Sequence, residues 1–544
     1  MPSAIAVDKG CRASVASRAA AILLDRISLG FAITCLVAVG ILYSVLPAVP
    51  SGDGPVHLYF ATVYRRLLGA DAWYGKWYAF RHVVQPYSFH YLLLSLLESV
   101  CTPARAETAF VILTLALTWL GLFRTFSSCG RRPALYPWIV PLAFTWSLAG
   151  GFYNFCLGSA FAFHALACWI SLRRTGRQRA LVEYCMWVAL LVLAHPIPLL
   201  LLAMFTATET AVVRRAFAWR SPRLQIVAAA ATWYALVAPA LVYNTSQLNH
   251  DLRLGWHRET AMFVFTGQAT DYFSPFGLPH VLYRVALLAL PCCGMVLSLS
   301  GVKDRFRRRA MDEADCLAIV SLVVLVACCF LPTVVNGSNF LARRLAAMTW
   351  PLLAIAVAIR PPVSRIWSAG VALTGMAMSL VAIATLASSL PRLATQMAAF
   401  DGLPLPPRET GVFLESDAAL HVPNGSSYGM SYWIGVRAFL KRGDVLANSP
   451  WMEQTIVPLR EKSGHAFLGD SIDRGLINSP TRLYDAMKVS AGLRDQIASH
   501  SQFILYYGDD SDNMAELRKV LSPDWAWNCE AGAVYALCVR RGER

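Results

Sequence analysis

The chain has 544 residues, 56% of them hydrophobic and only 15% charged, with a mean hydropathy of +0.47 and a formal net charge of +15. A soluble protein carries about a quarter charged residues, so this composition excludes an ordinary soluble domain and indicates a polytopic membrane protein. The positive charge does not require nucleic acid, because Lys and Arg of membrane proteins collect in cytoplasmic loops. No basic patch falls on a recognisable soluble module, and we expect membrane lipid, not nucleic acid, as a partner.

The first apolar run, residues 28–49, is predicted to be the first membrane span. Its 22 residues are longer than the apolar segment of a secretory signal, and it lacks a convincing cleavage site. Residues 1–27 are predicted to be cytoplasmic because they contain the basic residues Lys9, Arg12, Arg18 and Arg26.

Further apolar runs approach or reach the roughly 20 residues that cross a bilayer. They are 106–123, 134–150, 153–172, 181–195, 197–213, 224–243, 279–300, 314–334, 345–359 and 366–389. The stretch 181–213 is too long for one span, and His195-Pro-Ile-Pro198 divides it, because proline lacks a backbone donor and disfavours helix in the residue before it. The pattern therefore predicts an α-helical domain, 28–389, with about eleven transmembrane helices.

The placement of arginines predicts the orientation. The loops that follow residues 123, 172, 213, 300 and 359 are all basic, and the spans alternate without conflict if these loops face the cytoplasm. The loop 50–105 and the C-terminal region then lie outside. This topology requires that Phe89–Val100, about a dozen residues that include Glu98, forms an interfacial or re-entrant helix and does not cross.

Residues 390–544 differ from the rest in being more charged and free of long apolar runs. We predict a small extracytoplasmic α/β domain after the proline-rich linker 404–407, with strands at 503–507 and 533–539 and one or two helices over 482–499. Cys529 and Cys538 in this domain form a disulfide if the compartment is oxidising, or are two buried free thiols. The other cysteines have no metal-ligand spacing and are interpreted as small apolar residues.

The loop Ser51-Gly-Asp-Gly-Pro-Val-His57 directly follows the first span. Pro55 suits the first turn of a helix, so an amphipathic helix is predicted from Val56 onward, with Asp53 just before it and His57 in its first turn. An ionised Asp53 can accept a proton from an attacking alcohol or amine. The alternative is that Asp53 caps the helix, as Asp residues near helix starts often do.

Several other polar residues fall at the predicted external ends of spans. Arg343 and Arg344 suit a phosphate group, or they anchor the helix at the membrane interface. His195 and Asn154 are candidate substrate-binding residues, and each can instead be a satisfied polar group at a turn. The acidic and histidine residues of the loop 244–278 lack a specific metal spacing, so a solvated loop is favoured over a metal site.

This arrangement resembles the GT-C-type membrane glycosyltransferases, which include protein mannosyltransferases and lipid A aminoarabinose transferases. The matching pieces are the loop 51–57 and Gln85-Pro-Tyr-Ser-Phe-His-Tyr-Leu-Leu-Leu94, which is similar to that group's Pro-Pro-Leu-aromatic stretch. The resemblance covers roughly residues 25–390 in architecture. One departure is that Gly54 and Pro55 follow Asp53 where members often carry paired acids, which leaves a divergent or inactive member open.

The resemblance implies transfer of a hexosyl or pentosyl group from a polyprenyl-phosphate-linked donor to an unidentified acceptor at the external face of a cell inner membrane. It implies that Asp53 is the general base or orients the acceptor, and that Arg343 and Arg344 hold the carrier phosphate. His57, His195 and Asn154 complete the expected substrate-binding set, and no cofactor or metal is expected. Two other functions stay open. A transporter or flippase would be favoured by internal repeats, which we do not find. A non-catalytic assembly protein for envelope polysaccharide is the third alternative.

Overall fold

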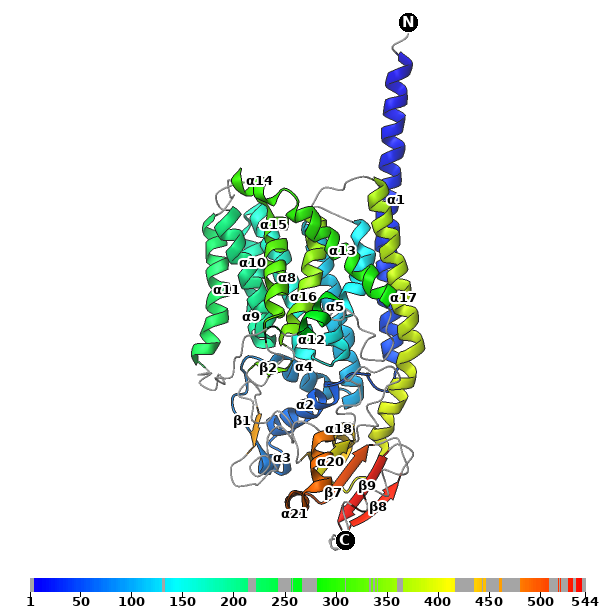
Figure 1. The fold of residues 1–544 in the computed structure, drawn as a ribbon, viewed down its shortest axis with the longest axis vertical. Coiled ribbons are helices and arrows are strands. Elements are labelled where there is room, and N and C mark those ends of the chain that lie inside the picture. The colour runs from blue at the N-terminus through cyan, green and yellow to red at the C-terminus, as the bar shows by residue number, and fades with distance from the viewer. Residues whose placement is uncertain are drawn as a thin grey trace.

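The computed structural model describes residues 4–129, 133–213, 222–242, 256, 258–266, 281–308, 310–331, 334–335, 338–339, 341–359, 365–415, 435–442, 444–446, 459–461, 480–507, 517, 519, 527–531 and 535–540. Helices pack side by side into a bundle, and the C-terminal domain lies at one end of it (Figure 1). Helix α1, Ala4–Val45, extends beyond the opposite end (Figure 1). The predicted α-helical polytopic fold with a small C-terminal α/β domain is confirmed.

Among the described residues, five helices are long and apolar enough to cross a membrane: α1, α5 (Pro103–Ser128), α8 (Tyr153–Thr175), α16 (Leu341–Ile359) and α17 (Arg365–Ala398). The bundle also contains α9 (Gln178–Ala194), α10 (Pro196–Val213), α11 (Pro222–Val242), α13 (Val281–Leu299) and α15 (Glu313–Cys328). The break between α9 and α10 falls at His195, as expected from the prolines that follow it. The number of eleven spans stays a prediction.

The run 134–150 is not the single continuous helix that its apolar composition predicted. It forms three short pieces, the 3-10 helix η1 (Pro133–Trp138), α6 (Ile139–Ala143) and α7 (Trp146–Ala149). Pro137 and Pro141 lack the backbone donors that a long helix needs. The first piece is held against α17 by side chains, because Trp138 Nε1 donates to the carbonyl of Val371 at 2.8 Å.

The segment between α1 and α5 lies between the bundle and the C-terminal domain (Figure 1). It contains α2 (Gly54–Leu68), α3 (Ala72–Trp77), β1 (Tyr78–Phe80) and α4 (Phe89–Glu98). The 10 residues of α4 are about 15 Å long at 1.5 Å per residue, half the thickness of a bilayer core, so α4 alone is too short to cross. Its last residue, Glu98, accepts hydrogen bonds from Thr62 at 2.9 Å and Arg65 at 3.2 Å, which join α4 to α2.

Four smaller elements of the described chain lie between residues 258 and 339. They are α12 (Arg258–Phe265), α14 (Val302–Arg307) and the paired strands β2 (Val334–Val335) and β3 (Ser338–Asn339). The basic helix α14 lies at the end of the bundle opposite the C-terminal domain (Figure 1). A further strand, β6 (Leu459–Glu461), pairs antiparallel with β1.

The C-terminal domain is built on a five-stranded sheet with the order β5-β4-β7-β9-β8. Its strands are β4 (Thr410–Glu415), β5 (Val445–Leu446), β7 (Phe503–Tyr507), β8 (Trp527–Ala531) and β9 (Tyr535–Arg540). Strand β4 runs parallel to β5 and β7, whereas β9 runs antiparallel to β7 and β8. The helices are α18 (Val436–Arg442), α20 (Pro480–Val489) and α21 (Ala491–His500), after the 3-10 turn η4 (Ala399–Gly402).

The predicted strands at 503–507 and 533–539 correspond to β7 and β9, and the predicted helical stretch 482–499 corresponds to α20 and α21. Helix α17 continues to Ala398, past the boundary predicted at residue 390. Cys529 and Cys538 are register partners on β8 and β9. Cys538 is disulfide-bonded, which favours the first of the two alternatives for these cysteines.

Candidate functional site

The loop 51–53 lies against the turn between α7 and α8. The amide of Gly52 donates to the carbonyl of Ala149 at 3.0 Å, and the amide of Asp53 donates to the carbonyl of Gly150 at 2.9 Å. The turn needs a glycine at position 151, because Gly151 has a φ of +76° and a Cβ there would lie 2.4 Å from the Gly54 nitrogen. The turn 149–151, about a hundred residues further along the chain, therefore fixes the backbone of Asp53.

The carboxylate of Asp53 is not used as a helix cap. Asp53 occupies the cap position of α2, but its side chain makes no capping hydrogen bond; its backbone carbonyl accepts from Val56 and His57, both at 3.1 Å. Burial raises the pKa of Asp53 to about 7, and the nearby positive charge of Arg344 partly opposes this shift. A carboxyl with a pKa near neutrality is suited to proton transfer.

Arg344 and Arg343 are neighbours in the sequence but point to different surroundings. The guanidinium of Arg344 lies 3.9 Å from the ring centre of Phe152 at the start of α8, whereas that of Arg343 lies 4.5 Å from the ring centre of Phe263 on α12. Arg344 is 8% exposed, and its Nε atom has no hydrogen-bond partner. No carboxylate in the described part of the chain lies within ion-pair distance of Arg344.

His57 lies in a buried group of rings formed by α2, α4 and α8. Its Nδ1 atom is 3.0 Å from Nε2 of His90, and its ring stacks on Tyr153 with 5.6 Å between ring centres. Burial, and secondarily Arg344, lowers the pKa of His57 to about 3, and burial also lowers the pKa of His90. Both imidazoles are therefore neutral at pH 7, and one donates a hydrogen bond to the other.

His195 joins the start of α10 to the loop before α4. Its Nδ1 atom accepts a hydrogen bond from the amide of Ile197 at 3.1 Å, and its Nε2 atom lies 2.8 Å from the Tyr87 hydroxyl. Because Nδ1 is an acceptor, the neutral ring carries its proton on Nε2 and donates it to the Tyr87 oxygen. The Tyr87 proton is then available for another acceptor. His195 is thus a satisfied polar group at the turn before α10, where it accepts the Ile197 amide, and it also orients the Tyr87 hydroxyl.

Tyr87 has a backbone φ of +72°, a conformation that residues other than glycine rarely adopt. Such strained residues cluster at functional sites. Burial raises the pKa of Tyr87 to about 12, and the charge of Arg344 opposes this rise. The hydroxyl therefore stays protonated at pH 7 and can act only as a donor toward an anion near Arg344.

Asn154 lies in the first turn of α8, where its Oδ1 atom accepts the amide of Phe155 at 2.8 Å. It is buried, and its amide group is at least partly used to satisfy the start of that helix. The predicted residues Asp53, His57 and His195 all lie within electrostatic range of Arg344, while the guanidinium of Arg343 packs on Trp146 and Phe263. The residues that sequence reasoning missed are Tyr87, His90 and Tyr153, although two of them fall inside the segment 85–94.

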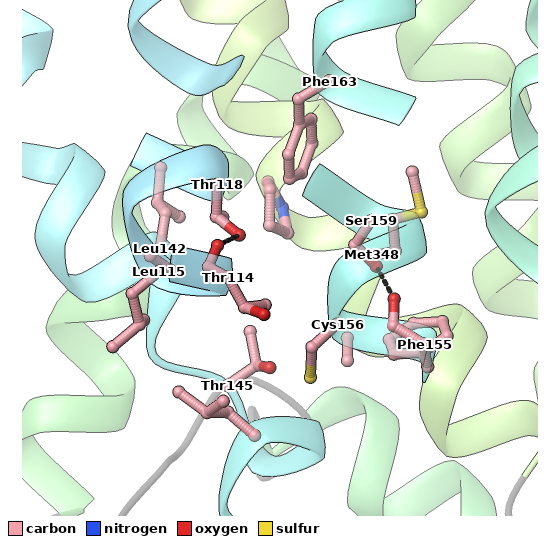
Figure 2. Close-up of a pocket in the computed structure, with 14 residues that line it drawn as sticks. Thr114, Leu115, Thr118, Leu142, Thr145, Phe155, Cys156, Ser159, Phe163 and Met348 are labelled. Carbon is pink, nitrogen blue, oxygen red and sulfur yellow. Dashed lines mark hydrogen bonds between the residues drawn. The ribbon is translucent and has the colours of Figure 1, made fainter. Parts of the chain in front are cut away.

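A pocket inside the bundle lies close to this site but does not contain it. It is a small, partly open space between α5, α6, α8 and α16 (Figure 2). Ala347, Met348 and Pro351 line it, on the same face of α16 as Arg344, since they follow it by three, four and seven positions. Its polar groups are mainly the hydroxyls of Thr114, Thr118, Thr145 and Ser159. It contains no charged side chain that could bind a phosphate.

The loop 244–278 is the segment whose histidines and acidic residues suggested a metal site. Its histidines and most of its acidic residues lie outside the described residues. Within the described ranges, no group of three or more His, Cys, Asp or Glu side chains could hold a metal ion. The expectation that no metal is needed stays a prediction.

No family model matches the sequence, and no curated protein matches it. Solved structures do. The fold is that of the GT-C-type membrane glycosyltransferases. The chain is similar to ArnT from Cupriavidus metallidurans in the apo state, with a TM-score of 0.50 and 12% identity over 96% of this chain and 98% of that one.

The structure of the same ArnT bound to undecaprenyl phosphate gives a TM-score of 0.50 and 12% identity over 94% of this chain and 97% of that one. The arabinofuranosyltransferase AftD from Mycobacteria is also similar, with a TM-score of 0.48 and 14% identity over 94% of this chain and 41% of that one. At 12% identity, the similarity to ArnT establishes the fold alone.

Proposed function

We propose that this protein is a membrane glycosyltransferase that moves a sugar from a polyprenyl-phosphate carrier to an acceptor at the external membrane face. The fold supports a lipid-linked sugar transferase, and ArnT, which has the same fold, has been solved with undecaprenyl phosphate.

The proposal depends above all on Arg344. A buried guanidinium without a carboxylate partner is unfavourable unless an anion binds it. The Tyr87 hydroxyl, oriented by His195, supplies a second donor in the same region. A phosphate group that accepts from both would satisfy Arg344 and the proton of Tyr87 together. Arg343 packs on Phe263, so we assign the principal phosphate contact to Arg344 and keep Arg343 as a secondary one.

The proposed reaction is a displacement at the anomeric carbon of the sugar. The acceptor oxygen or nitrogen attacks this carbon and loses its proton to the ionised carboxylate of Asp53, with inversion. The bond between the anomeric carbon and the carrier phosphate breaks, and the phosphate oxygen leaves with the electron pair. Arg344 and Tyr87 stabilise the charge that develops on the phosphate. His57, His90 and Asn154 are proposed to contact the sugar or acceptor.

A transporter would place its charged groups along a path with access from both sides of the membrane. The charge of Arg344 instead acts on both Asp53 and His195. Asp53 directly precedes α2, and α2 lies with α4 and the C-terminal domain at one end of the bundle (Figure 1). This grouping favours the transferase over the flippase. With the basic helix α14 at the opposite end, we propose that the site faces outward from a cell inner membrane, with the N-terminus in the cytoplasm.

Equilibrium binding of undecaprenyl phosphate to purified protein tests the role of Arg344. Arg344→Gln should weaken binding at least about tenfold, because hydrogen bonds to charged groups are worth about 1.5–3 kcal/mol. Arg105→Gln removes an exposed arginine at the same end of the bundle and should bind like the wild type. Undecaprenol, which lacks the phosphate, should not distinguish the three proteins. Equal affinity of Arg344→Gln and wild type for undecaprenyl phosphate would contradict the proposal.

A further inference from the structure

A continuous series of buried side-chain interactions joins the C-terminal domain to the Asp53 loop. Arg437, on α18 of the C-terminal domain, donates from Nη1 to Oε2 of Glu107 on α5 at 2.9 Å. The other carboxylate oxygen of Glu107 accepts from the Tyr153 hydroxyl at 2.7 Å. Tyr153 in turn lies 3.1 Å from the hydroxyl of Ser51, two residues before Asp53.

The direction of each hydrogen bond follows from the charges. The Glu107 carboxylate, paired with Arg437, only accepts, so Tyr153 gives its proton to Glu107. The Ser51 hydroxyl must then donate to the Tyr153 oxygen. Arg437 is also held from the other side, because its Nε and Nη2 atoms donate to the two carboxylate oxygens of Asp401 at 2.9 and 2.8 Å. Every link therefore has one defined donor and one defined acceptor.

Both members of the central ion pair are buried, Glu107 fully and Arg437 with 1% of its side chain exposed. A buried charge that loses its partner is strongly destabilising, whereas replacing both partners by uncharged residues of similar size is often tolerated. The pair can therefore persist only while the C-terminal domain is docked on the bundle. Undocking would leave Glu107 without its cation and release Tyr153.

The network bears directly on the backbone of the candidate catalytic loop. Gly54 packs against three atoms of this hydrogen-bond network. A Cβ at position 54 would lie 2.0 Å from Ser51 Oγ, 2.5 Å from the Tyr153 hydroxyl and 2.8 Å from Glu107 Oε1. Tyr153 also stacks on His57. A shift of Glu107 would thus move Ser51, Gly54 and the ring of His57 together, on both sides of Asp53.

We propose that Glu107 and Arg437 are positioning residues through which docking of the C-terminal domain holds Asp53 in its reactive position. The effect on catalysis rests on the proposed function. The coupling between docking of the C-terminal domain and the position of the Asp53 loop can be measured without sugar transfer. The C-terminal domain then regulates the reaction from outside the membrane, because whatever loosens its docking also loosens the Asp53 loop.

The test compares the full-length protein with Glu107→Gln/Arg437→Met, which removes both charges of the buried pair; Asp401, the other partner of Arg437, is 35% exposed and is then solvated by water. Arg540→Gln is the matched control, since Arg540 is an exposed arginine of the same domain whose side chain donates to the backbone carbonyl of Ala498. Hydrogen exchange of the amides of Gly52 and Asp53 reports on the loop, and thermal unfolding reports on the whole protein. In parallel, undecaprenyl phosphate affinity and turnover of a polyprenyl-phosphate sugar are measured separately.

In the double variant we expect exchange at Gly52 and Asp53 to be at least about tenfold faster, with unchanged exchange in the interior of α5. Turnover should fall on the order of 10- to 100-fold, since small misplacements of catalytic groups have such effects, while carrier affinity should stay within about twofold. Wild-type exchange at these two amides would overturn the inference. Faster exchange in a protein whose wild type transfers no sugar would instead support the coupling and reject the proposed transferase.

Discussion

His195 and Tyr87 are 108 positions apart in the sequence, yet the Nε2 atom of His195 lies 2.8 Å from the Tyr87 hydroxyl oxygen. The Ile197 amide fixes the tautomer of the imidazole, and the imidazole fixes the direction in which the Tyr87 proton points. This pair therefore presents a hydroxyl donor within electrostatic range of the Arg344 guanidinium, which forms no ion pair with a carboxylate of the described residues.

Tyr87→Phe removes only the oxygen of this donor. We expect undecaprenyl phosphate affinity to fall about tenfold, because a hydrogen bond to a charged group contributes about 1.5–3 kcal/mol. Stability should also fall, by about 1–3 kcal/mol, because the buried Nε2–H of His195 loses its acceptor. Tyr234→Phe, at a tyrosine exposed on α11, is the matched control and should bind like the wild type. If Tyr87→Phe also binds like the wild type, the hydroxyl does not contact the carrier.

The pKa of Asp53, raised to about 7 by burial, predicts how the reaction depends on pH. A general base acts in its ionised form, so kcat/KM should rise with pH and level off above about pH 7. His57 cannot produce this limb, since its pKa is lowered to about 3. Rate measurements between pH 5 and 9 check the prediction, and a flat profile across that range would exclude Asp53 as the titrating base.

The raised pKa of Asp53 also predicts that the protein becomes less stable as the pH rises from about 4 to about 7. The carboxyl has a pKa near 4 in the unfolded chain and about 7 in the folded protein, so the folded state binds the proton more tightly. Asp53 therefore contributes most stability below pH 4, and this contribution is lost as the pH rises to about 7. Asp53→Asn should remove that slope and raise the melting temperature at pH 8. A variant that melts below the wild type at pH 8 would show that the ionised carboxylate is stabilised in the fold.

Gly54→Ala tests the close packing around the Asp53 loop. The added Cβ would meet Ser51 Oγ at 2.0 Å and the Tyr153 hydroxyl at 2.5 Å, so these groups must move. We expect a loss of about 1–3 kcal/mol in stability, typical of overpacking, and a clear fall in turnover. Gly75→Ala, where a Cβ would meet nothing within 4 Å, is the control in thermal unfolding and rate assays. Equal behaviour of the two variants would mean that the loop tolerates displacement.

Much of the fold was predictable from local patterns in the sequence. Apolar length identified long helices such as α5, α8 and α17, prolines located the break at His195, and short apolar runs in the C-terminal region predicted the strands β7 and β9. The same rule failed at 134–150, because apolar length does not reveal that this run, which contains Pro137 and Pro141, breaks after Trp138 and again after Ala143.

The site was predictable only in part. Asp53 could be found because it stands in a distinctive loop, but Arg343 and Arg344 could not be told apart, since successive residues of a helix point about 100° apart and the rotation of α16 is set by packing. The ion pair of Glu107 and Arg437 joins residues 330 positions apart, and no local pattern links them. Tyr87 and His90 lie within the segment 85–94, which was matched to a family motif only by its proline, leucine and aromatic pattern, without a role for either residue.

Sugar transfer by wild type and Asp53→Asn is the most direct measurement of the central claim. Purified protein is incubated with a panel of polyprenyl-phosphate sugars and an extract of envelope lipids and glycans as acceptor, and the released polyprenyl phosphate is measured. We predict release with at least one donor by the wild type, and none above background by Asp53→Asn, which should still fold and still bind undecaprenyl phosphate. Full transfer by Asp53→Asn, or no release by the wild type with any donor, would contradict the account.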